Sequence, residues 1–153
     1  MSKTQARSAA RLAAVQALYQ HEMEGTALPK LLTEFHHHRL GAEIEDAQYA
    51  KADAAFFDDV VKGTLARAEE IDAVIVARLA DGWTLDRLDK AMKAILRAGT
   101  YELIARADVP RGAVVNEYVD VAKAFFDARE AGFVNGLLDA SGGAVRGQQI
   151  PKG

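Results

Sequence analysis

A run of three histidines at residues 36–38 is the feature of this sequence that most directly suggests metal chemistry. Successive residues on a helix point about 100° apart, so adjacent imidazoles cannot converge on one ion, and helical metal sites use ligands four residues apart. The acidic pairs at 58–59 and 69–70 fail as acid–base partners because helical neighbours do not face each other. Solvated helix faces explain these residues better than a metal-dependent hydrolase does.

No catalytic motif is recognisable in the chain. It lacks the glycine loops that hold phosphates in Walker and dinucleotide sites, and it lacks a nucleophile elbow. It has no cysteine, which rules out disulfides and cysteine-based zinc sites. We therefore expect a protein that is not an enzyme and that needs no metal or cofactor.

Lys3, Arg7 and Arg11 recur every four residues and therefore line one face of the first predicted helix. Residues 1–21 carry these three charges and no acid, so in a chain of net charge −3 the remainder sums to −6. Such an asymmetry suggests an anionic partner, although the net charge argues against nonspecific coating of nucleic acid. If all three residues contact phosphates of a single strand, the slope of log K against log salt concentration should be about −2. On spacing alone, a merely solvated face remains the favoured explanation.

Phe133 is the candidate for stacking on a nucleic-acid base. It lies in Ala-Gly-Phe-Val-Asn-Gly, residues 131–136, at the start of the last predicted helix, where free backbone N–H groups can meet anions. A base stacked on an aromatic ring contributes about 1–3 kcal/mol. From the sequence alone, burial of Phe133 in the core is the stronger alternative.

Apolar residues at three- and four-residue steps indicate helices throughout. We predict helices over about 4–24, 28–41, 56–79 with a break near Arg67, 85–107, 113–127 and 130–140. Residues 42–51 are predicted to form a loop, and Thr84 to cap the central helix. Pro110 separates that helix from the next, because the residue before a proline avoids helical geometry.

These elements predict an all-α fold, a single-domain bundle of six to seven helices over residues 1–141, and a flexible C-terminal tail over 142–153 that begins at the glycine pair. A chain of 153 residues with 50% hydrophobic content can bury a core of its own. No apolar run reaches the 18 or so residues of a membrane span, and the N-terminus lacks the apolar region of a signal peptide. We expect a cytoplasmic protein with no membrane partner.

Several segments together resemble the NusB family of bacterial transcription antitermination factors. They are residues 9–20 (Ala-Ala-Arg-Leu-Ala-Ala-Val-Gln-Ala-Leu-Tyr-Gln), 97–103, 109–110, 114–117, 123–125 and 133–139. Their order and spacing match the family from about residue 7 to residue 140. The resemblance implies a fold of two packed helical sub-bundles.

The resemblance also implies an RNA-binding adaptor. Such a protein pairs with NusE, a small-subunit ribosomal protein, and binds the single-stranded boxA element of ribosomal RNA leader transcripts. Through NusE it joins the RNA polymerase antitermination complex and supports processive transcription of rRNA operons. The family's RNA-binding positions correspond here to Lys3, Arg7, Arg11 and Phe133. Its partner-facing positions correspond to Tyr19, Met23 and Asp86. Some members self-associate through the RNA-binding surface, so a homodimer stays open.

The sequence departs from the family pattern at both candidate RNA regions. Residues 8–10 are Ser-Ala-Ala where other members carry more basic residues, whereas Arg129 stands in the loop before Phe133 where some relatives have an acid. We hypothesise that Arg129 also binds RNA. Met92 replaces an acid found in some members at the partner interface.

The RNA-binding interpretation requires the first helix and the start of the last helix to lie side by side. The alternative is a protein–protein scaffold without direct RNA binding, whose basic N-terminus is only solvated.

Overall fold

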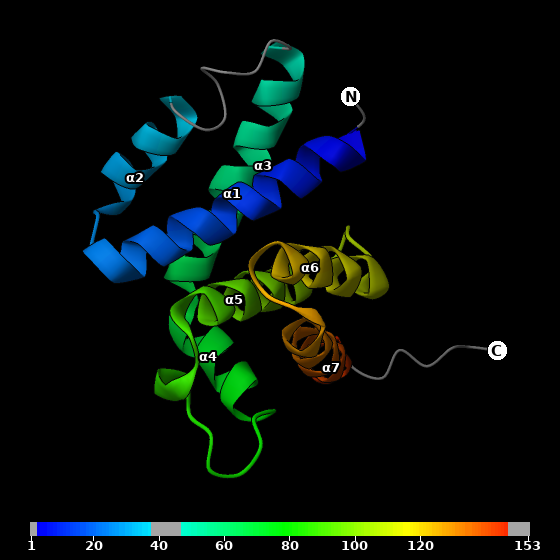
Figure 1. The fold of residues 1–153 in the computed structure, drawn as a ribbon. Helices are drawn as coiled ribbons and strands as arrows, with labels where there is room; N and C mark the ends of the chain where they lie inside the picture. The colour runs from blue at the N-terminus through cyan, green and yellow to red at the C-terminus, as the bar shows by residue number, and fades with distance from the viewer. Residues whose placement is uncertain (1–2, 38–46, 147–153) are drawn as a thin grey trace, which may run out of the picture. The chain divides into compact units, whose positions relative to one another are not determined.

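The computed structural model describes residues 3–37 and 47–146, with side chains described from residue 54 onward in the second range. Its backbone contacts divide the chain into two compact units, Met1–Ala66 and Arg67–Gly153. The described residues form seven α-helices and one short 3-10 helix, and they contain no strand (Figure 1). The predicted all-α fold is confirmed, and the two units correspond to the two helical sub-bundles that the resemblance implied.

The first unit contains α1 (Lys3–Glu24), α2 (Leu28–Phe35) and α3 (Ala47–Ala66). Figure 1 shows α3 crossing α1, and these two helices share the main packing interface of the unit. Small side chains on α1 allow this approach, because the buried positions include Ala6, Ala10, Ala13, Ala14 and Ala17. The Phe35 ring stacks on Phe57 with centroids 5.5 Å apart, which joins α2 to α3.

Two boundaries of the first unit bear on the sequence predictions. Helix α3 begins at Ala47, so the predicted loop at 42–51 is wrong for residues 47–51, and residues 38–46 lie outside the described residues. The break near Arg67 is confirmed, because α3 ends at Ala66 and α4 (Ala68–Val76) begins two residues later. None of the described helices is long and apolar enough to cross a membrane.

The second unit is organised around α5 (Lys90–Ala105), which packs against α4, α6 (Arg111–Phe125) and α7 (Ala128–Val145). The approach of α5 to α7 is close at Gly99, where an added Cβ would lie 2.8 Å from Leu138 Cδ1. Inside this core the Tyr118 hydroxyl donates a 2.5 Å hydrogen bond to the buried Glu102 carboxylate. The fully buried acid is therefore satisfied by a partner on α6.

The start of the central helix differs from the prediction. Thr84 precedes only the short 3-10 helix η2 (Leu85–Arg87) and makes no side-chain capping bond. The cap of α5 is Asp89, whose Oδ1 accepts hydrogen bonds from the N–H groups of Ala91 at 2.8 Å and Met92 at 3.3 Å. A capping carboxylate satisfies N–H groups that no helical carbonyl can reach, so the helix begins at Lys90 rather than at Leu85.

The last helix also runs further than predicted. Helix α7 continues through the glycine pair to Val145, so residues 142–145 are helical and do not belong to a tail, while residues 147–153 lie outside the described residues. The physical reason is packing, since Arg111 lies across this turn and a Cβ added at Gly142 would stand 2.8 Å from Arg111 Nε. Arg111 also donates to the Asp139 carbonyl oxygen at 2.8 Å.

Candidate nucleic-acid and partner interface

Two of the three basic residues on α1 pack on one aromatic ring of α3. The guanidinium carbon of Arg7 lies 4.6 Å from the centroid of the Phe56 ring, and that of Arg11 lies 4.8 Å from it. A guanidinium over an aromatic face is held by the ring quadrupole and keeps its positive charge. Phe56 therefore fixes the two charges side by side along α1.

The three basic residues differ in their exposure. Lys3 is exposed and Arg7 is half-buried, whereas Arg11 is only 3% exposed. The four-residue spacing was read correctly as one helix face, but this face turns toward α3 at Arg11. Direct contact with RNA is therefore easier for Lys3 and Arg7, while Arg11 has little surface for it and instead anchors Phe56.

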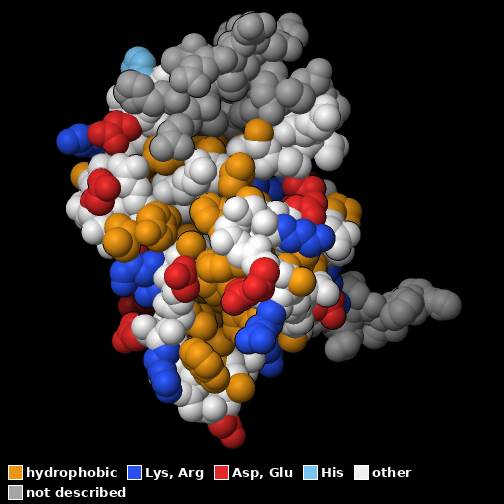
Figure 2. All heavy atoms as spheres, in the orientation of Figure 1, with side chains coloured by type: hydrophobic (Ala, Val, Ile, Leu, Met, Phe, Trp, Pro, Cys, Tyr) orange, Lys and Arg blue, Asp and Glu red, His pale blue; other side chains and the backbone are white. Residues whose placement is uncertain are grey.

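Charged side chains of both signs are interspersed on one face of the molecule. Figure 2 shows Lys and Arg beside Asp and Glu on the face drawn, with hydrophobic side chains exposed between them. This distribution agrees with the small net charge of −3. A small net negative charge gives little bulk attraction for a polyanion, so nucleic-acid binding would depend on a few placed residues.

Phe133 and Arg129 lie in the first turns of α7, and both are exposed. The Phe133 side chain is 39% exposed, which excludes the full burial that the sequence had favoured and leaves ring surface for stacking. Asp127 caps the helix by accepting a 3.1 Å hydrogen bond from the Arg129 N–H. Hydrogen bonding to the Glu130 side chain and to the Arg129 N–H holds the pKa of Asp127 below its ordinary value.

The residues expected to face a protein partner are also at the surface. Tyr19 is 40% exposed and Met23 is 50% exposed. They lie one turn apart on the same face of α1 and form a small exposed apolar patch. Asp86 is exposed on η2 of the second unit. Exposed large apolar side chains at helical spacing suit a docking helix or loop, although their role stays a prediction.

The candidate metal and acid–base residues take part in ordinary contacts. His36 Nε2 lies 2.6 Å from Asp58 Oδ1, and the His36 ring meets Phe57 edge-on at 6.0 Å. No group of three possible metal ligands occurs among the residues that the structure describes. His38 lies outside the described residues. The His36–Asp58 pair thus ties the end of α2 to α3.

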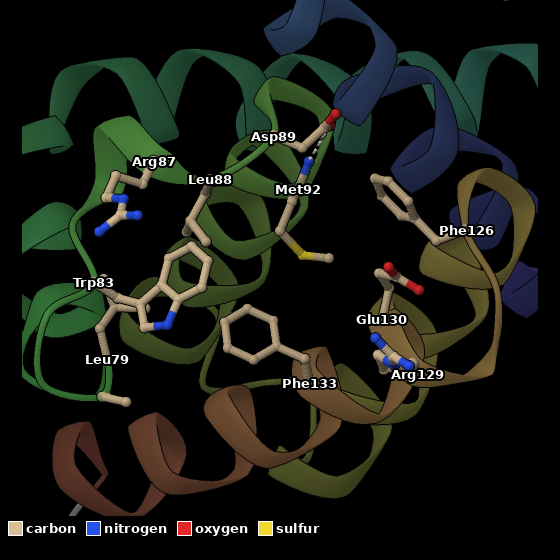
Figure 3. Close-up of a pocket in the computed structure, with 11 residues that line it drawn as sticks. Leu79, Trp83, Arg87, Leu88, Asp89, Met92, Phe126, Arg129, Glu130 and Phe133 are labelled. Carbon is tan, nitrogen blue, oxygen red and sulfur yellow. Dashed lines mark hydrogen bonds between the residues drawn. The ribbon is translucent and has the colours of Figure 1, made fainter.

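A pocket in the second unit was missed by the sequence reasoning. It has a volume of about 680 Å³ and is lined by Leu79, Ala80, Trp83, Arg87, Leu88, Asp89, Met92, Phe126, Arg129, Glu130 and Phe133 (Figure 3). Trp83 lies in the loop between α4 and η2 and is 49% exposed. An exposed tryptophan in a loop was the available signal, because exposed large aromatics are frequent at binding sites.

The structure groups the candidate residues by unit. Lys3, Arg7 and Arg11 belong to the first unit, and Arg129 and Phe133 belong to the second. Within the second unit, Arg129 and Phe133 line the same pocket. The side-by-side arrangement of the first and last helices stays a prediction.

Comparison with known proteins identifies relatives over nearly the whole chain. The model of the NusB family matches residues 8–142. The transcription antitermination protein NusB of Sphingopyxis alaskensis is 76% identical over 144 residues, which cover 94% of this chain and 97% of that protein. The protein of the same description from Novosphingobium aromaticivorans is 70% identical over 141 residues, covering 92% and 95%.

Solved structures resemble the chain as well. NusB of T. maritima has a TM-score of 0.75 and 30% identity, and the match covers 89% of each chain. A crystal structure of the antitermination factors NusB and NusE in complex with double-stranded RNA has a TM-score of 0.77 and 28% identity, covering 92% of this chain and 98% of that one. That protein was thus solved with both kinds of partner expected here, although its RNA is double-stranded.

Proposed function

The chain belongs to the NusB family, and from this premise we propose that it is a transcription antitermination factor. It binds the single-stranded boxA element of ribosomal RNA leader transcripts together with NusE, and through NusE it joins the RNA polymerase complex. It acts as an adaptor and not as an enzyme. Because bacterial transcription takes place in the cytoplasm, this role also places the protein there.

The observation that carries the proposal is the 76% identity to an antitermination protein over 94% of the chain. The NusB–NusE structure with RNA supports both partners, since the matched chain is 28% identical to this one and the match covers 92% of this chain and 98% of that one.

Each candidate residue has a distinct part in the proposed complex. Lys3 and Arg7 neutralise phosphates, and the Phe56 ring holds the guanidinium groups of Arg7 and Arg11. Phe133 stacks on a base, and the exposed Arg129 contributes a charge beside it.

The protein partner is expected to use a different set of side chains. Tyr19, Met23 and Asp86 are exposed and contact NusE in this proposal. Few basic residues give weak RNA binding alone, so NusE must enlarge the RNA surface.

The proposal is tested by titrating fluorescent boxA RNA with the protein alone and with the protein saturated by NusE, at two salt concentrations. We expect at least tenfold tighter binding with NusE, together with weaker binding at the higher salt concentration in both series. A NusE-independent affinity, or failure of NusE to bind, would contradict the adaptor role.

A scaffold without RNA contact is the second candidate function, and the packing of Arg7 and Arg11 on Phe56 favours it. Both guanidinium groups already have a structural use within the first unit. This function predicts that an Arg7→Ala variant binds NusE normally and retains its cellular role. The adaptor function predicts normal NusE binding with weakened RNA binding, so the two candidates separate in one pair of titrations.

A further inference from the structure

One aromatic side chain of the first unit is in contact with two positive charges. Phe56, on α3, is buried, and the guanidinium carbons of Arg7 and Arg11 lie 4.6 Å and 4.8 Å from the centroid of its ring. Both distances are within the limit of about 6 Å for a cation–π interaction. Two cations of α1 therefore share a ring that comes from another helix.

The ring offsets two unfavourable effects in this arrangement. Like charges four residues apart on a helix repel each other, and Arg11, which is buried, has lost most of its contact with water. The negative face of an aromatic ring attracts both guanidinium groups. Phe56 therefore stabilises two neighbouring charges on α1 that would otherwise favour separation.

Arg7 is the member of this pair that presents more surface to a polyanion, because it is half-buried whereas Arg11 is buried. A guanidinium group binds an aromatic ring with its flat face, while its N–H donors point outward in the plane of the group. Contact with a ring and a bidentate contact with a phosphate therefore use different parts of the same side chain. The ring can hold Arg7 without taking its donors away from a phosphate.

A side chain that is held in advance binds more tightly. A long side chain with many rotamers loses this freedom when it binds, and the loss is equivalent to about two- to tenfold in affinity. The contact with Phe56 imposes part of this loss on Arg7 when the protein folds, before any RNA is bound. The affinity for RNA should therefore depend on a residue that RNA does not touch.

We propose that Phe56 is a positioning residue for RNA binding, which sets the affinity by holding the Arg7 guanidinium where a phosphate meets it. The proposal rests on the RNA-binding function proposed above and adds to it a residue of α3 that lies outside the basic row. In the alternative, the Phe56 ring serves only the packing of the first unit. The two explanations differ in whether the effect of Phe56 on RNA passes through Arg7.

The test is a double-mutant cycle with Phe56→Leu and Arg7→Ala, in which boxA RNA is titrated in the presence of NusE. Phe56→Leu keeps an apolar side chain and every charge, so it should weaken binding about fivefold without changing the slope of log K against log salt concentration. In the Arg7→Ala background the same change should weaken binding by less than about twofold. Equal losses in both backgrounds would overturn the proposal, because the ring would then act through packing and not through Arg7.

Two further variants separate the aromatic face from general packing. Phe57, the next residue on α3, is fully buried and stacks on Phe35 instead, so Phe57→Leu is the matched control and should leave RNA affinity within about twofold of the wild type. Phe56→Tyr keeps the ring face and should also stay within about twofold. A loss in either variant as large as that in Phe56→Leu would contradict the proposed role.

Affinity for NusE shows whether each variant is folded, and Phe56→Met takes the place of Phe56→Leu in the cycle if the leucine variant does not fold. The inference and the proposed function fail in different ways. If wild-type protein binds no boxA RNA, the proposed function itself fails. If Arg7→Ala weakens RNA binding and Phe56→Leu does not, only the role of Phe56 is overturned.

Discussion

The guanidinium carbon of Arg11 lies 4.8 Å from the centroid of the Phe56 ring, and this contact connects α1 to α3 at a position where the arginine is only 3% exposed. Arg7 shares the same ring, one turn earlier on α1. The basic row of the first helix is therefore partly a structural feature. The exposed Lys3 and the half-buried Arg7 present more surface to a polyanion than Arg11 does.

The Arg11–Phe56 contact should contribute to the stability of the first unit. We expect Arg11→Met and Phe56→Leu each to lower the free energy of unfolding, with a coupling energy of about 1–2 kcal/mol in a double-mutant cycle, because the pair is desolvated. Denaturant titration followed by circular dichroism measures it. Strictly additive effects would show that the ring does not hold the guanidinium.

Lys3 and Arg7 should control the salt dependence of RNA binding. Replacing both Lys3 and Arg7 by alanine removes two phosphate contacts and should make the slope of log K against log salt shallower by about 1.4, at about 0.7 per contact. Lys30→Ala/Lys62→Ala, which removes two exposed charges from α2 and α3, is the control and should leave the slope unchanged. Equal slopes for the two double variants would show that Lys3 and Arg7 do not contact RNA phosphates and are only solvated.

The exposed Arg129 at the start of α7 should also strengthen the binding of RNA. Arg129→Glu is expected to weaken boxA binding by about tenfold, since it replaces an attraction to phosphate by a repulsion. Lys62→Glu makes the same charge change on α3 and serves as the control. If a titration of Arg129→Glu matches the wild type, the residue does not compensate for the missing N-terminal arginines.

The end of α7 should be held by Arg146. Its guanidinium donates hydrogen bonds to four carbonyl oxygens at the end of α5 and in the following turn, those of Glu102 (3.2 Å), Leu103 (2.9 Å), Arg106 (3.0 Å) and Val109 (2.9 Å). Arg146→Ala is expected to lower the free energy of unfolding by about 2 kcal/mol, because each bond involves a charged donor. The exposed Arg78→Ala should change it by less than about 0.5 kcal/mol. If Arg146→Ala lowers the free energy of unfolding as little as Arg78→Ala does, the end of α7 beyond residue 141 adds no stability.

Local patterns predicted the helices well, and distant contacts explain where those predictions failed. Apolar periodicity gave the number and order of the helices, because each helix buries one stripe. The glycine pair at 142–143 predicts the end of the helix, but the Arg111 side chain, which belongs to α6, packs across this pair and the helix continues to Val145. No local rule contains that contact.

The candidate site was predictable to a similar degree. The spacing of the basic residues placed them on one face, but the partial burial of that face depends on Phe56, which is far away in the sequence. The pocket escaped prediction because Trp83, Met92 and Phe133 come from three separate elements. Sequence can propose residue types for a site, whereas the packing of helices decides which of them meet.

Selective recognition of boxA is the central claim, and it is tested most directly by comparing boxA RNA with a scrambled RNA of the same composition, each titrated with the protein in the presence of NusE. We predict that boxA binds at least tenfold more tightly than the scrambled strand at the same salt concentration. Equal affinities for the two strands would contradict it.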